Sequence, residues 1–357
     1  YNYRCSYPVI KTPKKTTKTV VRPIGTIAVL GPFNFPLHIP NGQIIPALLT
    51  GNSVIVKPSE YSVCVGKLME RLWGLCFLDI ESPIAFVYGD GNVGKRLVCH
   101  KKIDMVCFTG SSVTGKSIED TCYKLRKPCA LEMGGNNALI VEGKPSPHLV
   151  DHIIHSAFIS AGQRCSCARR LILNATHIPL IKQLISKVKK ISIAPYPTDI
   201  KPFMGPVVLP SIKTKLLTHK FPNTDSLLLS QDIGPGGLVS PRIDQANTLI
   251  DDEFFGPLLF IYVTDNFDAS IDLVNESKYG LSCSVYTPSK RNFNHAFNAI
   301  KSGIVNWNNP TTGASGMASF GGLKWSGNLH PGGFNMIDHC VVPVASAESK
   351  RPEGLSV

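Results

Sequence analysis

The sequence predicts an α/β protein built on doubly wound parallel sheets, with two domains. Three observations support this prediction. Short runs of β-branched residues alternate with amphipathic helical stretches along most of the chain, which is the pattern of parallel βαβ units. The 357 residues exceed what one hydrophobic core usually holds. Hydrophobic residues make up 43% of the chain and charged residues only 17%, which is typical of a well-packed globular protein.

The first half of the chain predicts an extended arm followed by a parallel sheet with helices on both faces. Residues 1–19 are polar and lysine-rich with two prolines, which is typical of an arm. Runs of β-branched residues bounded by Gly and Pro predict strands at 25–30, 53–56, 84–88 and 105–108. Periodic apolar residues between them predict helices at 41–49, 63–75 and 116–125.

The second half predicts another α/β unit on the same criteria. Strands are expected at 138–141, 170–173, 258–263 and 282–286. Helices are expected at 147–160, 180–190, 211–218, 270–275 and 291–300. Residues 203–250 are interrupted by Pro and Gly and predict little beyond the 211–218 helix.

Net charge and cysteine content narrow the possible function classes. The chain has 37 basic and 25 acidic residues, a net charge of +12. Its lysines lie in short scattered groups without interleaved aromatic residues, which favours solvated faces and attraction for acidic small molecules over nucleic-acid binding. The eleven cysteines show no pair at the two-residue gap of a zinc or redox site, so we expect free thiols and no metal.

Membrane and targeting segments are not expected. No apolar run reaches the length of a membrane span. The chain begins at Tyr1 and shows no charged-then-apolar leader. Together with the free thiols, these features predict a cytoplasmic protein.

Two glycine-containing segments are candidates for phosphate binding. Residues 89–94 match the dinucleotide fingerprint G-x-G-x-x-G after a strand, but the acidic residue expected at the end of the next strand is missing, so we interpret them as a tight strand-to-helix turn. The segment Gly110-Ser111-Ser112-Val113-Thr114-Gly115 opens a helix with small and hydroxyl residues. Its backbone N–H groups suit either a diphosphate or a plain helix cap.

Three polar residues lie at the ends of predicted strands. Asn34, in a turn with Pro32 and Pro36, offers an amide donor for an oxyanion, although a turn residue is the commoner role. Lys57 and Glu60 follow the strand at 53–56, where open α/β sheets bind ligands.

The chemistry of the chain centres on Cys165 and Glu132. Cys165 follows Gly162-Gln163-Arg164, a turn that can present a sulfur without steric cover. Glu132 precedes a Gly-Gly pair about one helix upstream. A thiolate that forms a thioester and a carboxylate that activates water would together support covalent catalysis. Each residue alone is weak evidence, because a lone cysteine is more often a buried packing residue.

Taken together, these stretches resemble the aldehyde dehydrogenase superfamily. Seven blocks occur in the family's order and cover nearly the whole chain. They are Gly31–Pro36, Lys57–Glu60, Phe108–Gly115, Leu131–Gly135, Gly162–Cys165, Glu253–Pro257 and Phe320–Gly322. The stretches at 41–42, 162–170 and 306–310 are most similar to the N-succinylglutamate 5-semialdehyde dehydrogenases of arginine breakdown.

The resemblance implies a role for each matching residue. Cys165 would attack the aldehyde, Asn34 and the Cys165 backbone N–H would hold the oxyanion, and Glu132 would activate the hydrolytic water. The segment from Gly110 to Gly115 would receive the cofactor diphosphate. Lys57 with Glu60 would hold the adenosine ribose, which favours NAD over NADP. Glu253 and Phe255 would position the nicotinamide ribose.

The resemblance also implies a succinylated, anionic substrate and a homo-oligomer. Arg164 is a candidate partner for the substrate carboxylates, or alternatively a structural ion-pair residue, and Ser166 and Ser315 would line the pocket. We expect a dimer or tetramer, with an oligomerisation arm at 1–22, an NAD domain at 23–133, a catalytic domain at 134–325 and a second oligomerisation strand within 326–357.

Two departures from the family pattern leave alternatives open. The family's segment before the Gly31 block is missing, and the stretch between Gly205 and Glu253 looks short. These features would fit a fragment, or an inactive remnant that acts only by binding or assembly. Acyl transfer to coenzyme A is another alternative, although relatives with that activity usually lack a carboxylate at the position of Glu132. A nucleic-acid binder is the most distant one.

Overall fold

The computed structural model describes residues 9–11, 15–79, 81–198 and 201–351, and its contacts divide the chain into two compact units. Unit 1 contains residues 1–131 together with 331–357, and unit 2 contains residues 132–330. Each unit is built on its own sheet, and both sheets carry helices, which confirms the predicted α/β class.

Unit 1 is a doubly wound sheet with strand order β5-β4-β3-β6-β7. The strands are β3 (Thr26–Leu30), β4 (Ser53–Lys57), β5 (Ile84–Phe86), β6 (Met105–Gly110) and β7 (Cys129–Met133). The central strand β3 runs parallel to β4 and β6, and β4 runs parallel to β5. The inward side chains of these strands, such as Ile27, Val54 and Met105, are fully or almost fully buried.

The crossovers of unit 1 explain why helices cover both faces of its sheet. Helices α1 (His38–Leu49) and α2 (Val63–Leu75) lead from β3 toward the β5 edge. Helices α3 (Gly91–Cys99) and α4 (Ser112–Leu125) lead back across to β6 and β7. Because such crossovers are right-handed, the two pairs lie on opposite faces, and the direction reverses between β3 and β6. Loops at such a reversal form the usual ligand crevice of open α/β sheets.

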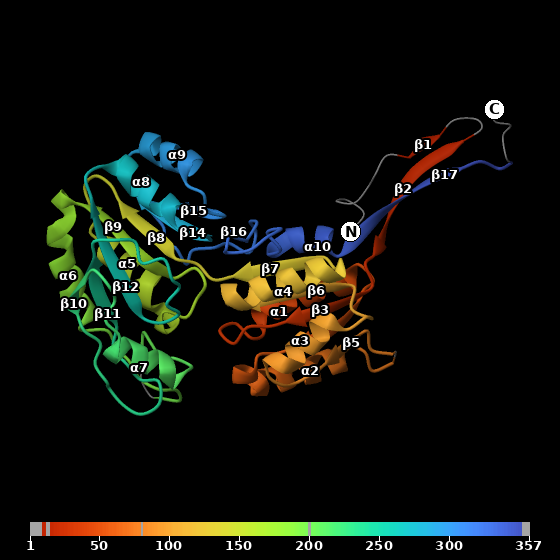
Figure 1. Cartoon of the computed structure of the whole chain (residues 1–357), viewed down its shortest axis with the longest axis horizontal. Helices are drawn as coiled ribbons and strands as arrows, with labels where there is room; N and C mark the ends of the chain where they lie inside the picture. The colour runs from red at the N-terminus through yellow and green to blue at the C-terminus, as the bar shows by residue number, and fades with distance from the viewer. Residues whose placement is uncertain (1–8, 12–14, 80, 199–200, 352–357) are drawn as a thin grey trace. The chain divides into compact units, whose positions relative to one another are not determined.

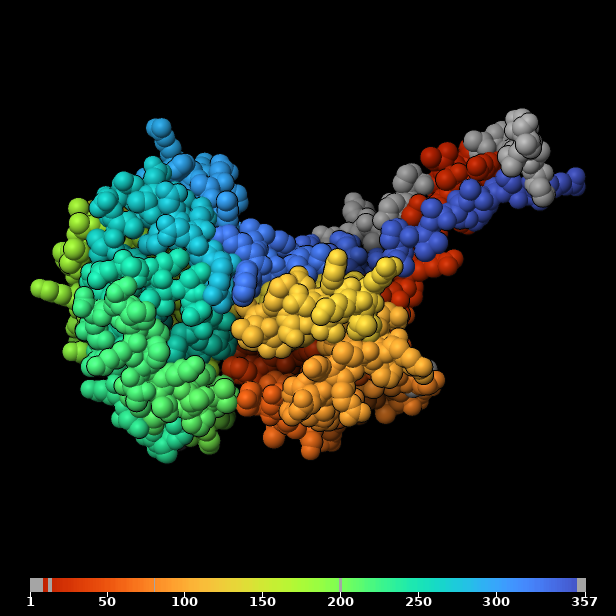
Figure 2. All heavy atoms as spheres, in the orientation of Figure 1, coloured from red at the N-terminus to blue at the C-terminus, as the bar shows by residue number. Residues whose placement is uncertain are grey.

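Strand β2 (Thr16–Pro23) pairs with β17 (Val341–Glu348) in an antiparallel ribbon. The pairing extends over eight residues of each strand, with the two-residue strand β1 (Ile10–Lys11) on the other side of β2. Figures 1 and 2 show β2 in red and β17 in blue running side by side. The two segments thus pair with one another within the chain, and their role in oligomerisation stays a prediction.

Unit 2 contains a seven-stranded sheet with the order β10-β11-β12-β9-β8-β14-β15. The strands are β8 (Asn137–Val141), β9 (Ala168–Asn174), β10 (Thr224–Leu228), β11 (Arg242–Ala246), β12 (Leu258–Thr264), β14 (Ser282–Tyr286) and β15 (Ile304–Trp307). Neighbours from β11 to β15 are parallel, and the edge strand β10 is antiparallel to β11.

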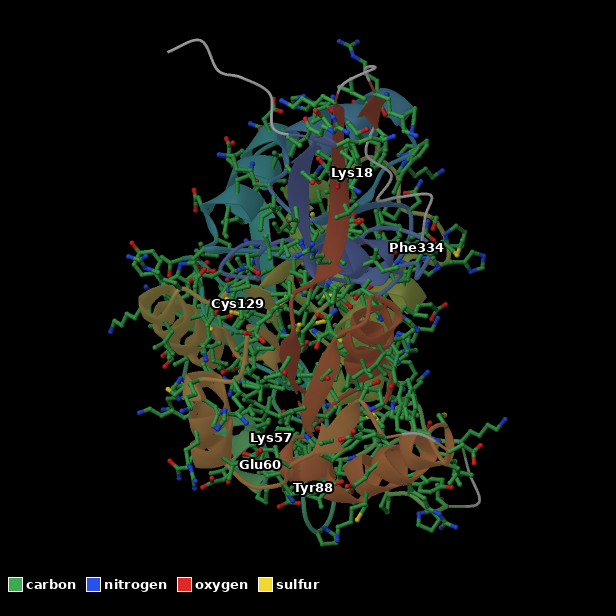
Figure 3. The ribbon with its side chains drawn as sticks, turned by 90° about the vertical axis from the view of Figure 1, so that its right-hand side faces the viewer. Lys18, Lys57, Glu60, Tyr88, Cys129 and Phe334 are labelled. Carbon is green, nitrogen blue, oxygen red and sulfur yellow. The ribbon has the colours of Figure 1, made fainter. Side chains whose placement is uncertain are left out.

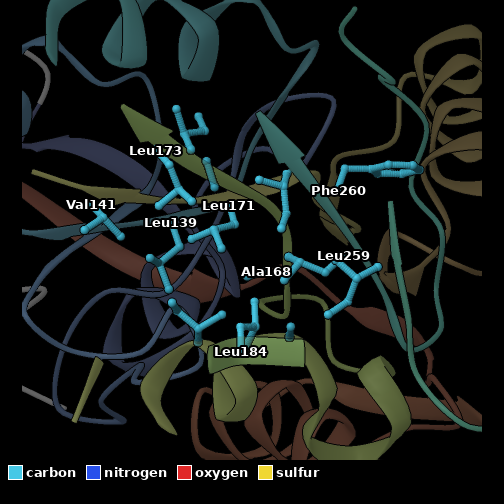
Figure 4. Packing of buried hydrophobic residues seen from close by; sticks show 14 of the residues in the cluster. Leu139, Val141, Ala168, Leu171, Leu173, Leu184, Leu259 and Phe260 are labelled. Carbon is cyan, nitrogen blue, oxygen red and sulfur yellow. The ribbon is translucent and has the colours of Figure 1, made fainter. Parts of the chain in front are cut away.

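Helices pack on this sheet to form the larger hydrophobic core. They are α5 (Leu149–Phe158), α6 (Ile178–Val188), α7 (Pro210–Thr218), α8 (Phe267–Glu276) and α9 (Lys290–Ala299). Figure 4 shows Leu139, Leu171 and Leu259 of the sheet and Leu184 of α6 within this cluster, and all four are fully buried. A small pair, β13 (Tyr279–Gly280) and β16 (Leu323–Lys324), and the short helix α10 (Met336–His339), which belongs to unit 1, complete the main elements.

The structure contains several elements that the sequence did not predict. Strands β7, β10, β11 and β15 lie in segments for which no strand was predicted. Helix α4 begins at Ser112 rather than Lys116, because Ser111 accepts the Thr114 N–H and so caps the helix. None of the described helices is both long and apolar enough to span a bilayer.

Candidate active site

The amino-terminal edge of the unit 2 sheet brings together three segments that the sequence singled out. Residues 134–136 precede β8, residues 165–167 precede β9, and residues 253–257 precede β12. These strands are neighbours and parallel, so their amino ends meet at one edge. The expected site residues of unit 2 therefore gather at the opposite edge from the one at which open α/β sheets usually bind ligands.

A left-handed turn presents Cys165 at this edge. Helix α5 ends at Phe158, and Ser160, Ala161 and Gly162 then adopt φ values of +54°, +55° and +66°. Such values are strained for residues with a Cβ. A Cβ at Gly162 would also collide with the Gly256 carbonyl oxygen. We call residues 160–167 the nucleophile turn.

Asn137 fixes the nucleophile turn from the first residue of β8. Its Nδ2 donates to the carbonyl oxygens of Cys165 (2.6 Å) and Cys167 (2.8 Å). Its Oδ1 accepts the Ser282 N–H of the next strand at 2.9 Å. One buried amide therefore ties the turn to two strands of the sheet.

The Cys165 thiol is half-buried in an environment that opposes its ionisation. Burial, followed by the negative charges of Glu132 and Glu253, raises its pKa to about 12, whereas a hydrogen bond with the Ser166 backbone N–H favours the thiolate. The structure thus brings Cys165 and Glu132 close enough to interact electrostatically.

Glu132 lies on β7 with its side chain 7% exposed. Burial raises the pKa of its carboxyl well above the ordinary value. Its Oε1 has no hydrogen-bond partner among the described residues. A buried carboxyl with an unused oxygen, beside a thiol, can accept a proton from a water molecule at the same place.

Glu253 provides a second carboxyl at the same edge. Its Oε1 accepts the Gly135 N–H at 3.1 Å. The Glu253 carboxylate occupies the space that a Cβ at Gly134 would take, so a larger residue there would displace it. Burial raises the pKa of Glu253 to about 7, while the charge of Arg169 and the Gly135 hydrogen bond oppose the rise.

The candidate substrate residues are spread around the nucleophile turn and a loop that follows β15. Arg164 Nε donates to Ser160 Oγ at 3.0 Å, and Ser166 is buried. Burial, followed by the charge of Arg164, lowers the pKa of His155, whose Nδ1 lies 3.2 Å from Thr312 Oγ1. The loop at 312–315 is thereby linked to α5. Ser315 itself is exposed, and its Oγ accepts the Met317 N–H at 3.2 Å.

In unit 1, the segment from Gly110 to Gly115 forms the turn from β6 into α4. Ser111 caps the helix, with its Oγ 3.3 Å from the Thr114 N–H. Ser112 is buried, and its Oγ lacks a hydrogen-bond partner among the described residues, whereas Val113 is 79% exposed. This turn follows a strand at the reversal of the sheet, where helix N–H groups are available to an anion.

Lys57 and Glu60 lie together at the carboxyl end of β4, as Figure 3 shows. Lys57 Nζ is 3.4 Å from Glu60 Oε2 and 3.2 Å from the Pro58 carbonyl oxygen. Lys57 is buried and Glu60 is exposed, so the carboxylate is accessible to a ligand. Asn34 is half-buried in the loop after β3, where its Oδ1 accepts the Phe35 N–H at 3.1 Å.

Residues 89–94 form a turn from β5 into α3, in agreement with our interpretation of this fingerprint match. Asp90 caps the helix through the Asn92 N–H at 3.0 Å.

Comparison with known proteins decides the family. The model of the aldehyde dehydrogenase family matches residues 4–343. The chain belongs to the aldehyde dehydrogenase family.

Solved structures of similar proteins agree with this assignment. 1-Pyrroline-5-carboxylate dehydrogenase from Thermus with bound NAD matches with a TM-score of 0.91 and 27% identity, covering 98% of this chain and 71% of that one. Betaine aldehyde dehydrogenase from Staphylococcus aureus in complex with NAD+ matches with a TM-score of 0.88 and 27% identity, covering 98% and 72%. Proline utilization A from Bdellovibrio bacteriovorus matches with a TM-score of 0.88 and 29% identity, covering 97% and 38%.

Sequence reasoning missed three residues that shape the site of this aldehyde dehydrogenase. Asn137 holds the nucleophile turn, and Gln163 bridges it to other segments through the Phe255 carbonyl (3.4 Å) and the Val208 N–H (3.1 Å). Arg169 is buried beside both Phe255 and the turn. Polar residues directly before or inside an apolar strand were the available signal, because such residues must find partners when buried.

Proposed function

We propose that this chain oxidises an aldehyde to a carboxylic acid through a thioester on Cys165. The observation that carries the proposal is the buried carboxyl of Glu132, with an oxygen unused by the described residues, acting on the Cys165 thiol. A nucleophile and a base at one site are what acyl formation and hydrolysis require.

In the first stage, the Cys165 sulfur attacks the aldehyde carbon as the thiolate. The Ser166 N–H favours that thiolate, and the nucleophile turn fixes the direction of the sulfur. We assign the Asn34 side-chain amide and the Cys165 backbone N–H to the oxyanion that develops on the aldehyde oxygen. The product of this attack is a thiohemiacetal on Cys165.

We propose NAD as the cofactor, held by the matching residues of unit 1. The segment Gly110 to Gly115 fits a diphosphate, since the buried Ser112 Oγ has no hydrogen-bond partner among the residues that the structure describes. The accessible Glu60 carboxylate beside Lys57 fits ribose hydroxyls and repels a 2′-phosphate. Glu253 and Phe255 would orient the nicotinamide ribose. When bound, NAD would accept a hydride from the former aldehyde carbon, and with loss of the proton on its oxygen the acyl group would remain on Cys165 as the thioester.

In the second stage, Glu132 takes a proton from a water molecule that attacks the thioester. Burial raises the pKa of its carboxyl, and a carboxylate with a raised pKa accepts a proton more readily than an ordinary one. Hydrolysis releases the carboxylic acid and returns the Cys165 thiol. Water is consumed, and the oxidised product gains its second oxygen from it.

For the substrate we propose N-succinyl-L-glutamate 5-semialdehyde. One support is that residues 162–170 and 306–310 resemble the N-succinylglutamate 5-semialdehyde dehydrogenases. The others are the positive charge of Arg164 beside the nucleophile and the net charge of +12, which both suit an anionic substrate. Arg164 would pair with a substrate carboxylate, and Ser166 and Ser315 would donate hydrogen bonds.

The experiment measures NADH absorbance after the semialdehyde is added to wild type and to two variants. Cys165→Ala should abolish turnover. Glu132→Gln should give one burst of NADH per site followed by a slow phase about a thousandfold below wild type, because the thioester forms but its water is not activated. Glutamate 5-semialdehyde and succinate semialdehyde serve as matched alternative substrates. Steady turnover in Cys165→Ala, or no turnover by folded wild type with any of the three aldehydes, would overturn the proposal.

A further inference from the structure

The strand that follows Cys165 carries two consecutive buried arginines with different surroundings. Arg169 and Arg170 are 1% and 2% exposed, and Arg169 lies where the register between β8 and β9 shifts by one residue. All three side-chain nitrogens of Arg170 donate to backbone carbonyls, those of Asn136, Leu273 and Val274. Arg170 therefore uses each of its three nitrogens in holding the fold.

Arg169 instead joins two segments of the catalytic edge. Its Nη2 donates to the Gly162 carbonyl (2.5 Å) and the Arg164 carbonyl (3.4 Å) of the nucleophile turn. Its Nη1 donates to the Gly256 carbonyl at 3.0 Å, and its guanidinium lies 5.7 Å from the centre of the Phe255 ring. One planar cation thus bridges the turn that carries Cys165 and the segment that carries Glu253.

The charge of Arg169 is not neutralised by an ion pair with any described carboxylate. It acts on Glu253, whose pKa it lowers, and on the Cys167 thiol, whose pKa it also lowers. Its Nε has no acceptor within the described part of the chain. Burying a cation with an unused donor costs free energy, so packing alone does not explain Arg169 at this place.

The nucleophile turn needs an external tie of this kind. Its residues with positive φ are strained, and they lie outside the hydrogen-bonded strands of the sheet. Buried carbonyl oxygens require donors, and Arg169 supplies one to Gly162 and a second one to Gly256, whose carbonyl also accepts the Leu258 N–H.

We propose that Arg169 is a positioning residue that locks the nucleophile turn onto the Glu253–Gly256 segment and so fixes the Cys165 sulfur relative to the Glu253 carboxylate. Its effect on rate rests on the proposed function, whereas the lock itself does not. The charge of Arg169 adds a second effect, since it favours the ionised form of Glu253 against burial.

Two variants separate the lock from the charge. Arg169→Lys keeps a cation but cannot donate in two directions with a planar group, and Arg169→Met removes both features. Arg242→Lys is the matched control, because Arg242 is also buried in unit 2 and bonds to the carbonyls of Leu216 and His219 and to Asp244, none of which belongs to the site.

Hydrogen–deuterium exchange with peptide resolution tests the lock without any turnover. Both Arg169 variants should exchange about tenfold faster than wild type in peptides covering 158–167 and 253–257, because a local tie is lost. Arg242→Lys should leave these peptides unchanged. Wild-type exchange in both Arg169 variants, or equal acceleration in the control, would overturn the proposal.

Kinetics test the consequence for catalysis. Both Arg169 variants should lose about a hundredfold in kcat for aldehyde oxidation, with a smaller change in KM, because the sulfur is misplaced after binding. The charged groups facing Glu253 are Arg169, Cys165 and Cys167, with Glu132 also acting on Cys165. Arg169→Met should therefore raise the apparent pKa of Glu253, seen in the pH dependence of kcat, above its value of about 7. Arg169→Lys keeps the positive charge and should leave this apparent pKa unchanged.

The outcomes distinguish this inference from the proposed function. If wild type oxidises no aldehyde, the proposed function fails, and the exchange experiment still decides the lock. If wild type is active and Arg169→Met retains its kcat and pH profile, the positioning role is wrong.

Discussion

At the scale of single residues, the site places two carboxyls and a thiol in surroundings that disfavour their ionised forms, and the two carboxylates add to the cost of ionising the thiol. Burial is the first cause of the raised pKa at Cys165, Glu132 and Glu253 alike. Groups with shifted pKa values gather at functional sites, because burial and neighbouring charges adjust the pKa of a nucleophile or a base to its task. The stability of unit 2 must then depend on pH in a defined direction.

Glu253→Gln tests that direction. The pKa of Glu253 is raised from 4.5 to about 7, so its favourable contribution is complete below pH 4.5 and is lost as pH rises through about 7. The variant should match wild type near pH 4.5 and exceed its free energy of unfolding at pH 8 by about 3 kcal/mol. Urea unfolding followed by circular dichroism at both pH values measures this difference. Both proteins contain Glu132, so its titration cancels in the comparison. If the two proteins differ in unfolding free energy by the same amount at both pH values, the raised pKa of Glu253 is wrong.

At the scale of elements, the nucleophile turn depends on a glycine that no other residue can replace. At Gly162 the backbone has a φ of +66°, and a side chain would collide with the Gly256 carbonyl, which belongs to the backbone and cannot rotate away. Gly162→Ala should therefore lower the free energy of unfolding by about 3 kcal/mol and abolish turnover.

The neighbouring residue provides the control for this prediction. Ala161 has a φ of +55° and already bears a Cβ, so Ala161→Gly should relieve strain and be neutral or stabilising by about 1 kcal/mol. Thermal and urea unfolding of the two variants measure both effects. A Gly162→Ala protein as stable as wild type would show that the turn can relax.

Elements with strong apolar patterns could be predicted from the sequence. Helix α2 occupies Val63–Leu75 as expected, and β14 occupies Ser282–Tyr286, since both have clear periodicity and Pro, Gly or polar boundaries. Strands β10 and β11 were missed because their sequences, TDSLL and RIDQA, are mostly polar. In β11 the buried pair of Arg242 and Asp244 replaces the apolar side chains that a pattern search requires.

The candidate catalytic residues were easier to predict from the sequence than the residues that hold them in place. Cys165 and Glu132 stood out by residue type next to glycines, but Asn137 and Arg169 act through contacts with residues 28 and 87 positions away. Such partners depend on which parallel strands become neighbours, and that information is not local in the chain.

At the scale of the whole molecule, the net charge of +12 should steer acidic substrates. Raising ionic strength from about 0.01 M to about 1 M shortens the Debye length from about 30 Å to about 3 Å. The kcat/KM for N-succinylglutamate semialdehyde should then fall about tenfold, while that for a neutral aldehyde such as propanal should change little. Steady-state NADH assays over a salt series measure both. Equal losses for the two aldehydes would indicate a general salt effect rather than steering.

The ribbon of β2 and β17 also affects the order in which the chain can fold during synthesis. Met336 and Cys340, from the short segment before β17, are fully buried in the core of unit 1, and the Cys340 carbonyl accepts a hydrogen bond from Asn52. These residues are synthesised after all of residues 132–330. Unit 2 can therefore fold as a continuous segment before the C-terminal residues of unit 1 have been made. During that interval the core of unit 1 lacks Met336 and Cys340, so its early strands complete their packing only when the end of the chain has been made.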